Sequence, residues 1–208
     1  MSDNTNTEIK IKNAAVYEFA HFGLAGARVD RIAKKAKINK AMIYYHHKSK
    51  EKLYESIISE AYDNFFQNIF IETPNDLKPD IHIENIIRKL LSKTSELDIL
   101  YFQIFLKEIA DGAKYIKKLV LQPYILPMIA TIQGLIKKGN NDKIFNNTDH
   151  LYAFMPIIGS VLIFNIIRYI SKGSDMEKVF FSGNYIEKFT ENILDIYMNG
   201  ILVRKEEK

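Results

Sequence analysis

The chain of 208 residues contains no cysteine and only five prolines, at positions 74, 79, 123, 127 and 156. Without cysteine it cannot form a disulfide, use a thiolate nucleophile or bind zinc through sulfur. The few prolines leave long windows that can be helical. The N-terminal segment MSDNTNTEIKIK is polar and has no apolar core. We therefore expect a disordered lead-in, no signal peptide and a cytoplasmic protein.

The chain also lacks the patterns that carry catalysis. No glycine-rich phosphate loop, nucleophile elbow or H-E-x-x-H motif is present. Asp98, Glu108 and Asp111 fall on a predicted helix, and we expect them to be surface charges. An enzyme with a small helical fold is the weakest hypothesis, because no catalytic constellation supports it. The sequence predicts a non-enzyme with no cofactor and no metal site.

A seventeen-residue run without charge, 151–167, approaches the length of a membrane-spanning helix. Pro156, Gly159, Ser160 and Asn165 interrupt this run. We therefore predict a helix buried inside the protein or against a second copy, and no membrane partner.

Basic residues are concentrated near the N-terminus, although the formal net charge of the whole chain is only +4. The segment 28–52 alone carries nine Lys or Arg residues against Asp30 and Glu51. A surface of this charge attracts a polyanion, because each phosphate it neutralises releases condensed counterions. Charge alone would also fit a solvated helix face. The spacing of the apolar residues must therefore distinguish a solvated face from a surface that binds a polyanion.

Sustained alternation of apolar and polar residues is missing, so the fold class is predicted to be all-α with about nine helices. Apolar spacing places helices at 8–22, 29–36, 40–46, from 50 through Ile69, 81–94, 96–111, from Pro123 to 138, 149–171 and 185–202, with a shorter segment at 114–121. Breaks are expected at Thr73-Pro74-Asn75 and Pro79, and loops at 139–147 and 172–184.

Two of these helices form a short hairpin with one inward face. Val29, Ile32, Ala33 and Ala36 share helical spacing, and Ile43 and His47 continue the apolar line after the turn Lys37-Ile38-Asn39. Asn39 is a suitable N-cap for the second helix. This is the geometry of a helix-turn-helix, whose second helix enters the major groove of DNA.

The outer face of the hairpin supplies the predicted DNA contacts. Lys40 can reach phosphate or guanine, Ala41 and Met42 can lie on a thymine methyl, and the aromatic residues can donate to phosphates. The predicted DNA-binding residues are Arg28, Asn39, Lys40, Ala41, Met42, Tyr44, Tyr45, His46 and Lys50.

The segment of about 9–53 resembles the DNA-binding domain of the TetR family of bacterial transcriptional regulators. The family pattern F-x-x-x-G, I-A-x-x-A-G-V-S, L-Y-x-H-F and S-K-x-x-L is similar to FAHFG (19–23), IAKKAKIN (32–39), IYYHH (43–47) and SKEKL (49–53). Lys37 replaces a usual glycine, His47 replaces an inward aromatic residue, and Ala27-Arg28 replaces a usual Thr pair.

The resemblance implies two domains, a three-helix DNA-binding domain at 1–53 and a helical ligand-binding and dimerisation domain at 54–208. It implies an apolar effector pocket, for which the candidates are Tyr101, Phe102, Phe105, Tyr124, Met128 and Met155. It also implies a homodimer, for which the candidate interface residues are Phe154, Ile158, Leu162, Ile166, Ile186, Phe189, Ile193, Ile196 and Tyr197.

The function expected from the resemblance is a repressor that binds an inverted-repeat DNA operator and is released by a small apolar ligand. The alternative is a DNA-binding regulator whose C-terminal domain binds a protein partner. The absence of an enclosed cavity would favour this alternative. The sequence does not identify the operator, the effector, the regulated genes, or whether the output is repression or activation.

Overall fold

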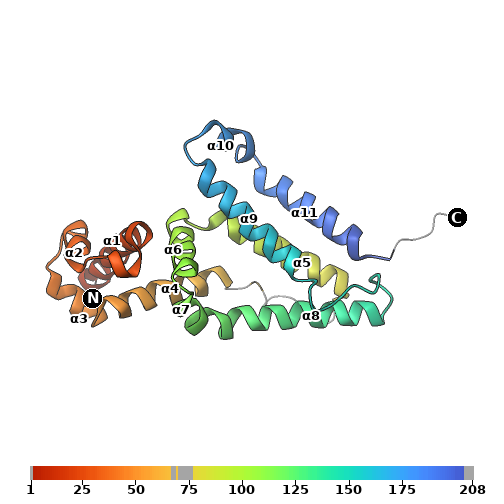
Figure 1. Ribbon diagram of the computed structural model, residues 1–208, viewed down its shortest axis with the longest axis horizontal. Helices are drawn as coiled ribbons and strands as arrows, with labels where there is room; N and C mark the ends of the chain where they lie inside the picture. The colour runs from red at the N-terminus through yellow and green to blue at the C-terminus, as the bar shows by residue number, and fades with distance from the viewer. Residues whose placement is uncertain (1, 67–68, 70–76, 204–208) are drawn as a thin grey trace. The chain divides into compact units, whose positions relative to one another are not determined.

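The computed structural model describes residues 2–66, 69 and 77–203, and within them it contains helices and no strand. The all-α class is therefore confirmed. The chain divides into two compact units (Figure 1). Unit 1 comprises Met1–Phe65 and Leu97–Pro123, and unit 2 comprises Phe66–Glu96 and Tyr124–Lys208.

The N-terminal part of unit 1 is a three-helix domain. It consists of α1 (Ser2–Gly26), α2 (Val29–Ala36) and α3 (Lys40–His47). The bounds of α2 and α3 agree with the prediction to within one residue, whereas α1 is longer than predicted at both ends and kinks at Gly23. The helix α1 begins at Ser2, so the expectation of a disordered lead-in was wrong. Ile11, Phe19 and Ile32 are fully buried, and they build the core from the predicted inward faces.

Unit 1 continues with α4 (Lys50–Phe66), α6 (Ile99–Ala110) and α7 (Lys114–Ile116). Lys52 N–H donates to Ser49 Oγ at 3.1 Å, so Ser49 caps the first turn of α4. α6 starts three residues later than predicted, because Asp98 accepts a hydrogen bond from Leu100 N–H at 2.8 Å and caps this helix. α1 packs against α6, so the three-helix domain and α6 share one core.

A π-helical segment, Lys117–Ile125, precedes α8 (Leu126–Asn141). We predicted that Pro123 would open the next helix, but it lies inside the π-helical segment. A proline lacks an N–H donor and clashes with the preceding turn of an α-helix, and irregular helical turns accommodate this defect. The helix α8 therefore begins after Pro123 rather than at it.

Unit 2 is built around α5 (Pro79–Glu96), which contacts α8, α9 (Met155–Ser171) and α11 (Tyr185–Ile201). Ile83, Ile86 and Ile87 of α5 are completely buried. The short helix α10 (Asp175–Phe180) lies where we predicted a loop. The helix α9 starts at Met155 rather than near Asp149, because the chain from His150 to Phe154 forms turns. The predicted break at Thr73-Pro74-Asn75 is outside the described residues.

By length and composition, one described stretch is apolar enough to cross a membrane, the helical run Lys114–Asn141. Met128, Ile132 and Ile136 of this run are buried in unit 2, but only 22% of the apolar window is buried. The run 151–167, which we checked in the sequence, contributes mainly to α9, a helix of 17 residues.

Candidate functional site

The turn between α2 and α3 has a residue in an unfavourable backbone conformation. Lys37 ends α2 in the left-handed region with φ 56° and ψ 45°. Ile38 N–H then donates to Ala33 O at 3.1 Å, and this bond closes the helix end. Glycine takes this conformation without a steric cost, whereas lysine does not. The departure from the family pattern at Lys37 therefore places a non-glycine residue in the left-handed region.

The first turn of α3 is capped as predicted. Ala41 N–H donates to Asn39 Oδ1 at 2.9 Å, which satisfies one of the helix's open donors. Ile43 and His47 are buried on the inward face. Burial lowers the pKa of His47 below its ordinary value, because an imidazolium loses hydration inside the domain.

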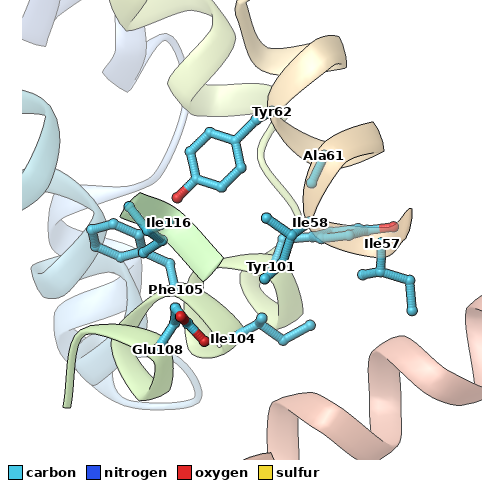
Figure 2. Close-up of a pocket in the computed structure, with 9 residues that line it drawn as sticks. All are labelled: Ile57, Ile58, Ala61, Tyr62, Tyr101, Ile104, Phe105, Glu108 and Ile116. Atoms are coloured by element: carbon cyan, nitrogen blue, oxygen red, sulfur yellow. The ribbon is translucent and has the colours of Figure 1, made fainter. Parts of the chain in front are cut away.

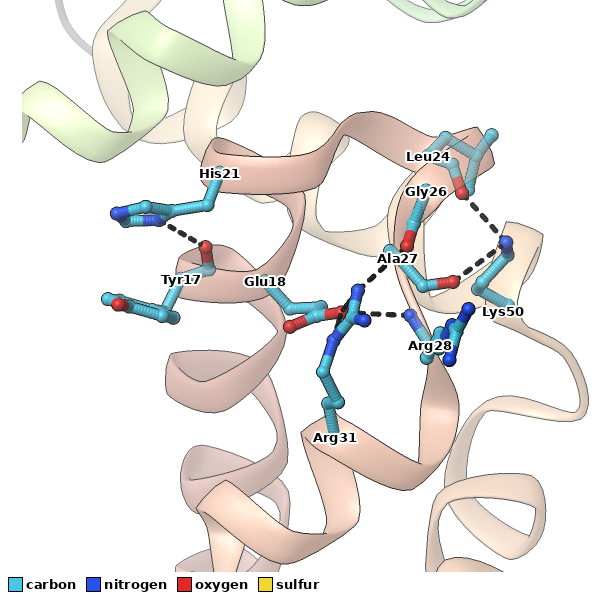
Figure 3. Close-up of polar contacts among 9 residues, drawn as sticks. All are labelled: Tyr17, Glu18, His21, Leu24, Gly26, Ala27, Arg28, Arg31 and Lys50. Atoms are coloured by element: carbon cyan, nitrogen blue, oxygen red, sulfur yellow. Dashed lines mark hydrogen bonds and ion pairs between the residues drawn. The ribbon is translucent and has the colours of Figure 1, made fainter.

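The first turn of α2 is stabilised by a residue that the sequence analysis missed. Glu18, only 3% exposed, accepts a hydrogen bond from Arg28 N–H at 2.9 Å and another from Arg31 Nε at 2.6 Å (Figure 3). Arg28 itself supplies no side-chain cap. The carboxylate of Glu18 thus replaces the missing hydroxyl cap from a distance of ten residues, which no local pattern would reveal.

Most of the predicted DNA-contacting face is accessible. Arg28, Asn39, Lys40 and Ala41 are exposed, and Met42 and His46 are half-buried. Tyr44 is 45% exposed and Tyr45 is 74% exposed. A large exposed aromatic side chain on a short helix is available for contact with another molecule. These residues lie on the outer side of α3, whose inner side holds Ile43 and His47.

Two lysines of the predicted set are already engaged within the protein. Lys40 Nζ lies 2.8 Å from Asp30 Oδ1, although both side chains remain exposed. Lys50 Nζ donates to Leu24 O at 2.7 Å and to Ala27 O at 3.1 Å (Figure 3). The ammonium of Lys50 therefore ties the end of α1 to the start of α4, a positioning role that the sequence analysis did not foresee.

The positive potential around α2 and α3 comes from more residues than the predicted contacts. Lys34, Lys37 and Lys48 are also exposed in this part of the chain. Lys35 Nζ lies 3.4 Å from the ring centroid of Tyr17, so this lysine packs on an aromatic face of α1. The exposed cations surround the accessible face of α3 and favour an anionic partner.

Comparison with known proteins agrees with this geometry. Residues 11–57 match the family model of the bacterial regulatory proteins of the tetR family. Residues 11–57 are therefore similar to the N-terminal segment of TetR-family proteins. The TetR-type segment includes α2, α3 and most of α1, which carry the turn and the exposed aromatic residues described above.

Two relatives that match part of the chain are named as HTH-type transcriptional repressors. The chain is 40% identical over 89 residues to the HTH-type transcriptional repressor SCO4008 of Streptomyces coelicolor, covering 43% of each chain. It is 43% identical over 61 residues to the HTH-type transcriptional repressor NicS of Pseudomonas putida, covering 29% of each. The matches thus span less than half the length of these relatives. Their names identify transcriptional regulators and not enzymes.

The TetR fold extends over nearly the whole chain. The ketosteroid transcriptional regulator of Mycobacterium tuberculosis superposes with a TM-score of 0.69 at 18% identity, over 95% of each chain. A TetR-like transcriptional regulator from Rhodococcus superposes with a TM-score of 0.68 at 15% identity, over 93% of this chain and 94% of the other. At such low identity, the likeness concerns the fold alone.

Unit 1 contains a small pocket between α4, α6 and α7 (Figure 2). Its free space is about 20 Å³, which suits one water-sized molecule. Most of the lining is apolar or aromatic, and Glu108 is the one acidic residue of the lining. The lining residues are Ile57, Ile58, Ala61, Tyr62, Tyr101, Ile104, Phe105, Glu108 and Ile116.

The structure brings only two of the six predicted ligand residues, Tyr101 and Phe105, to this pocket. Phe102 is buried beside them and stacks on Phe105 with a centroid distance of 5.9 Å. The other three belong to unit 2, where Tyr124 stacks on Phe66, Met128 is buried, and Met155 is 53% exposed. The family resemblance suggested all six, but the sequence could not show which helix faces meet.

The burial of Glu108 contradicts another prediction. We expected it to be a surface charge, but it is only 5% exposed, whereas Asp98 and Asp111 are exposed as predicted. Glu108 Oε2 accepts a hydrogen bond from Tyr54 Oη at 3.0 Å, and Oε1 accepts one from Tyr115 N–H at 2.5 Å. In the part of the chain that the structure describes, no group of acidic, histidine or cysteine side chains could hold a metal ion.

The predicted dimer surface is partly accessible. Leu162 is 37% exposed and Ile196 is 65% exposed, and Ile163, which we did not predict, is 53% exposed. Tyr197 is buried within unit 2, where its hydroxyl donates to Ala153 O at 2.9 Å, so it is a core residue. The remaining predicted residues, Phe154, Ile158, Ile166, Ile186, Phe189 and Ile193, are half-buried.

Proposed function

We propose that this protein is a transcriptional repressor that binds an inverted-repeat DNA operator as a homodimer. The observation that carries the proposal is the exposed face of α3, on which Lys40, Tyr44 and Tyr45 project from a helix anchored by Ile43 and His47. The repressor relatives matched over this region support the same assignment. A repressor acts on DNA in the cytoplasm, so we also propose that location.

The residues of the exposed face contact different parts of the DNA in this proposal. Lys40, Ala41 and Met42 lie at its N-terminus, which in a helix-turn-helix is nearest to the base edges. Arg28, Tyr44 and Tyr45 can donate to phosphate oxygens and fix the register of docking. Lys40 would exchange its ion pair with Asp30 for contacts to the operator. Lys50 contributes by holding α1 and α4 together rather than by contacting DNA.

Dimerisation would present two copies of α3 to one operator. The exposed Leu162, Ile163 and Ile196 offer apolar surface on α9 and α11 that a second copy can cover. A two-fold dimer requires half-sites separated by about 34–36 Å, one turn of DNA, which is why an inverted repeat is expected.

Release by a ligand is the second part of the proposal. A ligand can shift the repressor between DNA-binding and released states only through its differential affinity for them, on the order of 1–3 kcal/mol. The pocket beside Tyr101 and Phe105 is the candidate site. Its free space of about 20 Å³ requires the pocket to open for a larger effector. The alternative, a protein partner bound to the C-terminal domain, would not require the pocket to open.

The DNA-binding assignment can be tested with fragments selected from a random double-stranded pool. We expect that Lys40→Ala and Tyr44→Ala together weaken binding at least tenfold in a gel-shift titration, since each removes a contact made by the exposed face. Both side chains are exposed, so the circular dichroism spectrum should be unchanged. Lys137→Ala removes an exposed charge from α8 and should leave the affinity within about threefold. Parent-like binding by the double variant would disprove the assignment.

A further inference from the structure

Glu108 occupies an unusual position for a carboxylate, inside a mainly apolar wall at 5% exposure. Burial of an ionised carboxylate is costly unless a cation or several donors compensate for the lost water. Among the described residues, no Lys, Arg or His side chain forms an ion pair with Glu108. Its two hydrogen bonds come from Tyr54 Oη and Tyr115 N–H.

These two donors leave acceptor capacity unused. A carboxylate has about four lone-pair sites, and Tyr54 and Tyr115 occupy one site on each oxygen. Since Glu108 lines the pocket, the remaining sites are open to a molecule that enters it. A neutral apolar ligand would cover these sites without pairing them, which is unfavourable. An anion would be repelled, whereas a cation with N–H donors would satisfy both the charge and the lone pairs.

The rest of the lining distinguishes between kinds of cation. A metal ion such as calcium requires six or more oxygen ligands, and Glu108 is the only carboxylate in this lining. Tyr62, Tyr101 and Phe105 instead supply aromatic rings around the space, and Figure 2 shows Tyr62 extending from α4 toward Phe105 and Ile116. Aromatic rings attract ammonium groups and tolerate the apolar body attached to them.

We propose that this pocket binds a small organic cation, with Glu108 as the counter-ion of its ammonium group and the aromatic lining around its apolar body. The free space of about 20 Å³ fits the ammonium head, and the body enters as the pocket opens. The proposal names the effector class and therefore rests on the ligand-responsive function proposed above.

The position of Glu108 also explains how such a ligand would influence DNA binding. Glu108 holds the hydroxyl of Tyr54, and the ring of Tyr54 contacts Phe19 of α1 edge-on with a centroid distance of 4.9 Å. Phe19 and Tyr54 are both buried in unit 1. An ammonium group that draws the carboxylate toward the pocket competes with the Tyr54 hydroxyl and alters the packing of α4 on α1.

The test uses three probes that share one ring and differ in the charge of the head group: benzylammonium, benzyl alcohol and benzoate. Binding to the full-length protein is measured by titration calorimetry or ligand-observed NMR. We expect benzylammonium to bind roughly tenfold or more tightly than benzyl alcohol, since both can donate a hydrogen bond to the carboxylate but only the cation also neutralises its charge. Benzoate should bind more weakly than either. Equal affinities of the cation and the alcohol, or no saturable binding of benzylammonium, would overturn the proposal.

Substitution of Glu108 tests whether the preference for benzylammonium depends on this carboxylate. In Glu108→Gln the preference for benzylammonium should fall to within about twofold, whereas Asp111→Asn, which neutralises an exposed carboxylate at the end of α6, should preserve it. A preference that survives in a folded Glu108→Gln variant would contradict the assignment. If that variant does not fold, Glu108→Asp should keep the preference, and the three-probe comparison on the parent protein still decides.

Operator binding is measured separately, so the two proposals can fail independently. A cation preference that depends on Glu108 but leaves operator affinity unchanged supports the site and contradicts ligand release. Release of the operator by a neutral molecule without any cation preference supports ligand release and contradicts the site.

Discussion

At the scale of single residues, the helix-turn-helix depends on local backbone conformation and on polar contacts between residues distant in the sequence. Lys37 shows the first kind, because its left-handed conformation follows from the tight exit of α2 and could be expected from its place in the family pattern. Glu18 shows the second kind, because its carboxylate reaches a helix that begins ten residues later. The sequence shows that Lys37 departs from the family pattern. It contains no signal that Glu18 caps α2, because this contact depends on the packing of α1 against α2.

Replacing Lys37 by glycine should stabilise the protein. A left-handed conformation costs a non-glycine residue about 1–2 kcal/mol, and the greater flexibility of glycine in the unfolded chain offsets part of this gain. We expect Lys37→Gly to raise the free energy of unfolding by about 0.5–1 kcal/mol in urea denaturation. Lys34→Gly, at an exposed position inside α2, should lower it by about 1 kcal/mol. A loss of stability in Lys37→Gly would contradict the strain assigned to this turn.

At the scale of elements, close packing decides which helix positions accept a side chain. The helix α8 contains two glycines with opposite surroundings. A Cβ atom at Gly139 would lie 2.1 Å from the ring of Phe145, whereas a Cβ atom at Gly134 would meet nothing within 4 Å. The ring of Phe145, 2% exposed, thus occupies the space that Gly139 leaves on the helix surface. Sequence periodicity cannot distinguish the two glycines, because both fall inside one helix.

Alanine substitution in α8 should separate these two glycines. We expect Gly139→Ala to lower the free energy of unfolding by about 2–3 kcal/mol, because the methyl group displaces the buried Phe145 ring. Gly134→Ala should raise it by about 0.5–1 kcal/mol, since alanine favours the helix and the site is open. Thermal and urea denaturation of the two variants give the comparison. Equal effects would show that Phe145 does not pack against Gly139.

At the scale of the whole molecule, the exposed apolar surface of unit 2 is unusual for a protein that acts as a single copy. Leu162, Ile163 and Ile170 of α9 are exposed, as are Met176 and Val179 of α10. An isolated exposed apolar residue is ordinary, but a group of this size marks an interaction surface. The homodimer is therefore the prediction that belongs to this scale.

Charges placed on α9 should break the dimer. We expect Leu162→Glu combined with Ile163→Glu to shift the mass in sedimentation equilibrium from two copies to one, because each carboxylate would be buried against the partner. Binding to an inverted-repeat operator should weaken at least tenfold, since only one copy of α3 would then engage. Ile9→Glu, at a residue 53% exposed on α1, is the control and should remain dimeric. A parent protein of single-copy mass would remove the basis for the prediction.

The sequence alone determined the all-helical class, the helix-turn-helix and most helix boundaries near it, because these depend on local spacing and on caps such as Asn39. The tertiary structure decided that Glu108 is buried, that Lys50 binds carbonyls and that Tyr197 belongs to the core. It also decided which aromatic residues meet around one pocket. These outcomes depend on which helix faces come together, and helical periodicity identifies a face without identifying its neighbour.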